Sequence, residues 1–106
     1  MSELAIVLMT AGTKEEADEI AITLVRERLV ACVNVVPGVT SYYRWEGEVQ
    51  CDQEWLLVAK TKMALIEDLR QQVDALHSYD LPEVIAIPVT GGSQAYLDWV
   101  AGEIIE

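Results

Sequence analysis

The alternation of apolar and polar positions predicts an N-terminal strand followed by a helix. Residues 4–9 (LAIVLM) form an unbroken apolar run, which is typical of a central strand. Thr13 and Glu16, just after it, have the spacing of a capping box at a helix start. The helix itself is predicted by apolar side chains at i, i+3, i+4, i+7 and i+8, namely Ala17, Ile20, Ala21, Leu24 and Val25.

Two long arms rich in Val, Thr and aromatic residues follow, at 31–45 and 48–62, and they meet at Glu46-Gly47. A glycine between two such arms predicts a hairpin. Pro37-Gly38 predicts a break or bulge in the first arm, because proline cannot donate to a strand ladder. Each arm would extend roughly 45–50 Å, whereas a domain of this size is only about 30–35 Å across. We expect the aromatic tip to project and to be covered by another subunit.

The C-terminal half predicts a second helix, a fourth strand and a short last helix. The second helix is expected to begin at Thr61 or Lys62 and to carry an apolar stripe at Leu65, Leu69, Val73 and Leu76. A loop at 77–82 precedes a strand at 84–87, which Pro88 places at a sheet edge. Ser93 is expected to cap a helix that reaches about Gly102, with inward side chains at Tyr96, Leu97 and Val100.

This β-α-β-β-α-β order indicates a single α+β domain over residues 1–106. The common solution is a ferredoxin-like antiparallel sheet with both helices on one face, here with an extended hairpin and a short C-terminal helix. The first strand would lie between the second hairpin arm and the fourth strand. The other sheet face would have no cover within the chain, which is a second reason to expect oligomers.

Composition narrows the classes of partner. The chain is 52% hydrophobic, carries a net charge of −11 and has a pI near 4.3, so it is not expected to bind nucleic acid or an anionic membrane. The N-terminus has neither the basic region of a signal peptide nor the length of a membrane span. Cys32 and Cys51 form no CxxC motif or disulfide framework. A reducing cytoplasm is the expected location.

Four segments carry a family resemblance that covers nearly the whole chain: LVACVNVVPGVTSYYRWEGEV, EWLLVAKTK, SYDLPEVIAIPV and YLDWV. They look like the divalent-cation tolerance protein family, CutA. The resemblance implies a ferredoxin-like subunit that forms a tight homotrimer through the extended hairpins. It also implies a link to copper and other divalent metals, and a likeness to PII-type signalling trimers, which bind nucleotides between subunits.

The residues suited to soft ions such as Cu(I) are Met9, Cys32, Cys51 and His77, with no fixed-spacing motif among them. The predicted topology puts His77 and Met9 at the same end of the sheet, and the resemblance implies copper ligands at these two positions. Where some family members have a second histidine, this chain has Leu76. Core packing competes as the explanation for Met9 and Cys32, as does a helix C-terminal role for His77.

A second candidate site is polar. Its members lie in the family-like segments and are expected to line a cleft between the hairpin and the 79–82 loop: Trp45, Glu54, Lys60, Tyr79 and Glu83. Such a set can orient a small polar ligand or serve as a charge-satisfied interface.

Catalysis is not expected, because the chain has no nucleophile–histidine set and no phosphate loop. Three hypotheses stay open: a weakly metal-binding homotrimer of metal tolerance, a PII-like effector-binding trimer, and an inert structural trimer that acts through a protein partner.

Overall fold

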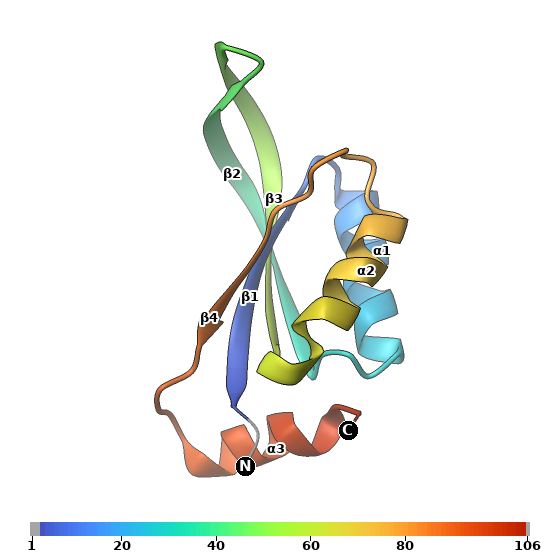
Figure 1. Ribbon diagram of the computed structural model, residues 1–106, viewed down its shortest axis with the longest axis vertical. Coiled ribbons are helices and arrows are strands. Elements are labelled where there is room, and N and C mark those ends of the chain that lie inside the picture. Colours follow the sequence, from blue (N-terminus) through green and yellow to red (C-terminus); the bar gives the residue numbers. More distant parts are fainter. Residues whose placement is uncertain (1–2, 106) are drawn as a thin grey trace.

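The computed structural model describes residues 3–105 and contains one sheet and three α-helices (Figure 1). A short 3-10 helix, η1, precedes the second α-helix. In chain order the elements are β1 (Leu4–Ala11), α1 (Lys14–Arg26), β2 (Cys32–Trp45), β3 (Glu48–Lys62), η1 (Met63–Leu65), α2 (Ile66–Leu76), β4 (Val84–Pro88) and α3 (Gln94–Glu103).

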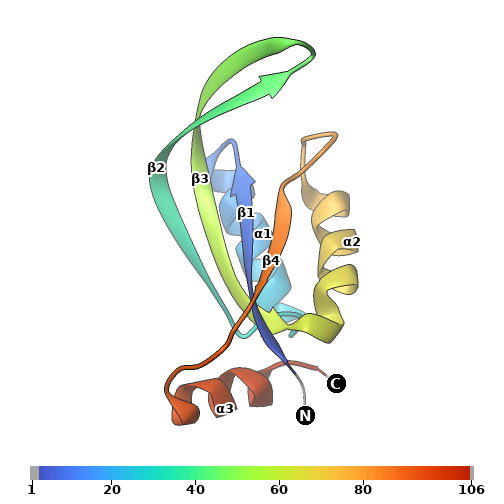
Figure 2. The same ribbon diagram turned by 60° about the vertical axis from the view of Figure 1, so that its left-hand side comes forward.

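The four strands are antiparallel in the order β2-β3-β1-β4. β1 lies between β3 and β4, as predicted, and β4 is the edge strand that Pro88 indicated. Helices α1 and α2 lie side by side on one face of the sheet, whereas α3 crosses below its lower end (Figures 1 and 2). The α+β, ferredoxin-like fold is confirmed.

The hydrophobic core lies between the sheet and helices α1 and α2. Alternate residues of β1 and β3 point to the helices, and Val7 and Met9 pair with Ala59 and Leu57 in this layer. All four are fully buried. The helices contribute the residues of their predicted stripes, which are Ala17, Ile20, Leu24, Leu69 and Val73.

The opposite face of the sheet is apolar and open. It carries Ile6 and Leu8 of β1, both half-buried. Ile85 and Ile87 of β4 pair with Leu8 and Ile6 and are about half exposed, at 53% and 47%. Contiguous apolar surface of this kind marks an interaction site. The expected oligomer stays a prediction, but its surface is present.

The hairpin projects beyond the rest of the molecule. β1 pairs with β3 only as far as Ala11 opposite Trp55, so residues 39–54 form a two-stranded ribbon. The molecule measures 44 × 25 × 22 Å as a result. The tip turns through Glu46 and Gly47, both at positive φ, and the predicted bulge lies between Val36 and Val39.

Several local expectations were wrong. Strand β1 continues to Ala11 rather than ending at Met9. The second helix starts later than expected, because Thr61 and Lys62 still pair with β1. Tyr96 does not pack inward within the chain; it is 44% exposed, because α3 packs through Val100 instead.

The capping box at the start of α1 is only half formed. The Thr13 hydroxyl accepts a hydrogen bond from the Glu16 backbone N–H at 3.2 Å, as expected. The Glu16 carboxylate, however, accepts hydrogen bonds from the backbone N–H and the hydroxyl of Ser78. Glu16 therefore connects α1 to the loop after α2 instead of closing its own helix turn.

Candidate functional site

A cavity with a volume of about 810 Å³ is the main candidate site. It lies where the hairpin leaves the sheet, beside the end of β1 and the loop between α2 and β4. Its lining residues are Thr10, Thr40, Ser41, Tyr42, Tyr43, Trp45, Glu54, Ser78, Tyr79, Asp80, Leu81 and Glu83. We call this cavity the acidic cleft.

The acidic cleft is lined by carboxylates, hydroxyl groups and aromatic rings. Glu54, Asp80 and Glu83 supply negative charge, and no lysine or arginine is among the lining residues. A concave surface lined by one sign of charge concentrates counter-ions. The lining thus favours a cation and disfavours a phosphate group.

Glu54 is held by Tyr79. The Tyr79 hydroxyl donates to Glu54 Oε2 at 2.7 Å, and Glu54 is only 7% exposed. Within residues 3–105 no hydrogen bond to Oε1 is seen, yet no buried polar side-chain atom there lacks a partner. The Oε1 atom therefore reaches solvent, where a ligand in the cleft can meet it.

The surroundings in the cleft disfavour the ionised forms of Glu83 and Tyr79. Burial, and after it the charge of Glu54, raises the pKa of the Glu83 carboxyl above its ordinary value. Burial and the hydrogen bond to Glu54 raise the pKa of the Tyr79 hydroxyl well above 10. Burial is the first cause of both shifts, and the negative charge of Glu54 adds to each; a bound cation would relieve the part that comes from this charge.

Four of the five residues predicted for the cleft line it: Trp45, Glu54, Tyr79 and Glu83. Lys60 does not. It pairs with Ile6 and Cys32 six residues along β3 from Glu54, which is roughly 20 Å along a strand. There its ammonium group donates to Asn34 Oδ1, so the cleft lacks the cation that we expected in it.

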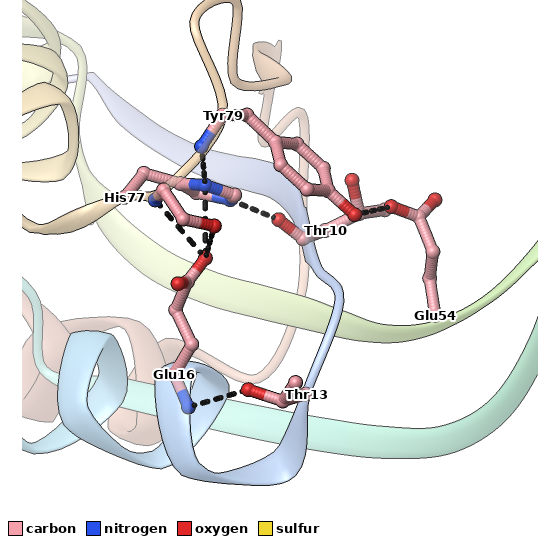
Figure 3. Close-up of polar contacts among 7 residues, drawn as sticks. Thr10, Thr13, Glu16, Glu54, His77 and Tyr79 are labelled. Carbon is pink, nitrogen blue, oxygen red and sulfur yellow. Dashed lines mark hydrogen bonds and ion pairs between the residues drawn. The ribbon is translucent and has the colours of Figure 1, made fainter.

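His77, a predicted metal ligand, has a fully buried side chain. Its Nε2 lies 2.7 Å from the carbonyl oxygen of Thr10. A carbonyl can only accept, so Nε2 carries the hydrogen and Nδ1 is the acceptor. Nδ1 receives the backbone N–H of Tyr79 at 3.1 Å, so both ring nitrogens are occupied (Figure 3).

The other predicted metal ligands differ in position: Met9 precedes Thr10 on β1, at the end of the sheet that His77 contacts, as predicted, whereas Cys32 lies toward the other end. Met9 is fully buried in the core layer beneath the helices. Cys32 pairs with Lys60 near the start of β1, whereas His77 contacts Thr10 near its end. Within residues 3–105 no three His, Cys, Asp or Glu side chains are grouped closely enough to hold a metal ion. One chain does not bring Cys32 and His77 together.

Several cleft residues were missed from sequence. Asp80 and Leu81 lie in the predicted loop directly after Tyr79, so their position in the sequence could have predicted that they line the cleft. Thr10 lies on β1, just past the predicted end of this strand at Met9. Thr40 and Ser41 line the cleft from β2, just past the bulge between Val36 and Val39, and no signal in the sequence placed them there.

A family profile described as CutA1 divalent ion tolerance protein matches residues 5–103. The divalent-cation tolerance protein CutA of Thermus thermophilus is 52% identical over 95 residues, which are 90% of this chain and 92% of that protein. The chloroplastic protein CutA of Arabidopsis thaliana is 50% identical over 95 residues, again 90% of this chain. The chain spans only 52% of that plant protein's length.

A solved structure has the same fold. The crystal structure of CutA1 from Oryza sativa superimposes with a TM-score of 0.95 at 44% sequence identity, covering 98% of this chain and 95% of that one. Separately, no helix within residues 3–105 combines the length and the apolar character needed to cross a membrane.

Proposed function

The chain belongs to the CutA1 divalent ion tolerance family, and on that premise we propose that it acts in the response to divalent metal ions by binding a divalent cation in the acidic cleft. The observation that carries the proposal is the lining of the cleft, in which Glu54, Asp80 and Glu83 face no lysine or arginine. The proposed role is binding rather than catalysis.

The oxygen-rich lining suits a hard, partly hydrated cation. Carboxylate, hydroxyl and water oxygens are the ligands that Mg²⁺ and Mn²⁺ prefer, and such ions keep several waters while bound by one or two carboxylates. Among residues 3–105 no group of three His, Cys, Asp or Glu side chains could hold a metal ion, so the proposed ion would be bound by one or two carboxylates, with water as its other ligands. We expect weak binding, with a Kd of roughly 10⁻⁴ to 10⁻³ M.

Copper binding through His77, Met9 and Cys32 is a second candidate with weaker support. It is favoured by the contact between His77 and Thr10, which places the imidazole at the end of β1 that was predicted. Against it stand the occupied ring nitrogens and the burial of Met9. A PII-like role with a nucleotide is disfavoured by the lack of a positive side chain in the cleft lining.

We further propose that the protein is a cytoplasmic homotrimer. Support for association comes from the open apolar face and the projecting hairpin. The acidic cleft continues from this face, because Thr10 and Glu54 follow the same alternation as Leu8 and Leu56. A neighbouring subunit would therefore border the cleft and exclude water from it. An inert structural trimer is the outcome if the cleft binds nothing.

Titration of the purified protein with Mn²⁺, Zn²⁺ and Cu²⁺, followed by calorimetry, tests the proposal. Glu54→Gln and Glu83→Gln should each weaken Mn²⁺ binding by about tenfold, since each removes a charged ligand. Glu19→Gln, at an exposed position on α1, is the matched control and should bind like wild type. No Mn²⁺ binding by wild type, or equal binding by all four proteins, would contradict the proposal.

A further inference from the structure

Tyr79 is held at both ends, by His77 two residues before it and by Glu54 on β3. Its backbone N–H donates to His77 Nδ1, and the two rings lie tilted against each other, with centroids 4.5 Å apart at an interplanar angle of 45°. At its other end the hydroxyl donates to Glu54 Oε2. Figure 3 shows this chain of contacts from His77 through Tyr79 to Glu54. The orientation of the Glu54 carboxylate thus depends on where the Tyr79 ring lies.

His77 is fixed on its own side by β1 and by the end of α2. The imidazole reaches β1 by donating from Nε2 to the Thr10 carbonyl oxygen. Glu16 Oε1 of α1 lies 3.0 Å from Nδ1, but with the hydrogen on Nε2 both atoms are acceptors, so this contact does not hold the ring, and Oε1 accepts its hydrogen bonds from Ser78. The His77 backbone N–H also donates to Val73 at the end of α2. The ring is therefore a fixed support that joins β1 and α2.

Gly12 leaves the space that the Tyr79 hydroxyl needs. A Cβ atom built on Gly12 would lie 3.0 Å from the Tyr79 hydroxyl oxygen and 3.7 Å from the ring atoms Cε1 and Cζ. That first distance is closer than ordinary van der Waals contact, so the Tyr79 hydroxyl would have to shift by a few tenths of an ångström to admit a methyl group there. Gly12 and His77 thus constrain the same side chain from two independent positions.

We propose that His77 is a positioning residue of the acidic cleft: it sets Tyr79 so that the phenol orients Glu54, and it controls cation binding without touching the cation. This inference rests on the proposed function. Direct ligation by His77 would need a lone pair on Nδ1, and so would break the bond to the Tyr79 N–H. Positioning and ligation therefore predict different behaviour for variants that keep only part of the imidazole.

Two substitutions separate the two halves of the ring. In His77→Asn the side-chain Oδ1 takes the place of Nδ1 and can still accept from the Tyr79 N–H. In His77→Gln the side-chain amide can still donate to Thr10, but no acceptor remains at the Nδ1 position. We expect Mn²⁺ affinity within about threefold of wild type for His77→Asn and a loss of roughly tenfold for His77→Gln, the range of one hydrogen bond.

A double-mutant cycle between Tyr79 and His77 is the decisive experiment. Tyr79→Phe should lose as much Mn²⁺ affinity as His77→Gln, and the double variant should lose no more than either single one, because both remove the same interaction. Gly12→Ala should give a similar loss with His77 intact. Additive losses in the double variant, or equal losses in His77→Asn and His77→Gln, would overturn the proposal.

A readout without metal separates this inference from the proposed function. Hydrogen exchange of the Tyr79 backbone amide should be at least several-fold faster in His77→Gln than in wild type, and close to wild type in His77→Asn. Unchanged exchange in His77→Gln would overturn the positioning role even if Mn²⁺ binds. If wild type binds no Mn²⁺ while the exchange pattern holds, the proposed function fails and the positioning of Tyr79 stands.

Discussion

Glu54 and Glu83 line the same cleft, but the fold treats their charges differently. Glu54 is more deeply buried and has the Tyr79 hydroxyl as a donor. For Glu83 no hydrogen bond or ion pair is seen in the part of the chain that the structure describes, and its carboxyl pKa is raised by burial and by Glu54. Glu83 is therefore the carboxylate that gains most from a bound cation.

The raised pKa of Glu83 predicts a specific dependence of stability on pH. Between the ordinary carboxyl value of 4.5 and the higher folded-state value, the folded protein keeps a proton that the unfolded chain has lost. The contribution of Glu83 to the free energy of unfolding is therefore fully present at low pH, and it decreases as the pH rises through that interval. Glu83→Gln has no carboxyl group to ionise, so it does not lose this stability. Its melting temperature should exceed that of wild type at a pH above the interval and match that of wild type at a pH below it.

Melting curves measured by circular dichroism from pH 4 to pH 8 check this. Glu19→Gln should run parallel to wild type over the whole range. If the difference between Glu83→Gln and wild type shows no change with pH, or grows toward low pH, the assigned cause of the shift is wrong.

At the same scale, four of the five residues predicted for the cleft line it, whereas Lys60 was placed there wrongly. Trp45, Glu54, Tyr79 and Glu83 were identified from family-like segments and from the loop after the second helix. The error over Lys60 is one of register: only the pairing of β3 with β1 and β2 shows that Lys60 faces Ile6 and Cys32. Hydrogen bonds of His77 were likewise invisible, since they join a loop to two separate elements.

At the scale of elements, the hairpin is the feature that local sequence specifies best. Val-rich and aromatic arms, the Glu46-Gly47 turn and the bulge near Pro37-Gly38 were all predicted and are confirmed. Helix starts were less predictable. The apolar run before α2 belongs partly to β3, whose last residues pair with β1, and a long-range pairing of this kind overrides local helix signals.

The turn of the hairpin contains a non-glycine residue, Glu46, in an unfavourable left-handed backbone conformation. Glu46 has φ of 51° and Gly47 has φ of 82°, the pattern of a type I′ turn, which prefers Asn-Gly. A non-glycine residue with a left-handed backbone costs roughly 1–2 kcal/mol, less for asparagine. Glu46→Asn should therefore raise the free energy of unfolding by about 0.5–1 kcal/mol and slow hydrogen exchange in residues 42–51.

Chemical denaturation and amide exchange measure this effect. Glu48→Asn, two residues away and on a strand, removes the same charge without serving the turn and should give no gain. An equal gain in both variants would show that charge, and not backbone conformation, is responsible.

At the scale of the whole molecule, two features suit contact with a partner subunit. The sheet face that carries Ile85 and Ile87 has no helix over it, and residues 39–54 extend beyond the third strand. The net charge of −11 opposes non-specific association through these apolar surfaces. Both features were predicted from the strand pattern and the length of the arms. The number of subunits could not be predicted in this way.

Sedimentation at micromolar concentration should give a mass about three times that of the 11.8 kDa chain. Ile87→Lys places a charge in the open face and should shift the protein toward monomer. Ile22→Lys is a matched control on α1, because Ile22 and Ile87 have the same exposure of 47%. A wild-type monomer, or equal dissociation in both variants, would contradict the assignment of this face as the subunit interface.

The most direct test of the acidic cleft is anomalous diffraction from crystals soaked in Mn²⁺. The proposed cation site predicts an anomalous peak in the cleft, beside the carboxylates of Glu54 and Glu83, with the His77 ring still bonded to Thr10 and Tyr79. A peak beside His77 instead, or no peak in the cleft at a Mn²⁺ concentration above the measured Kd, would contradict it.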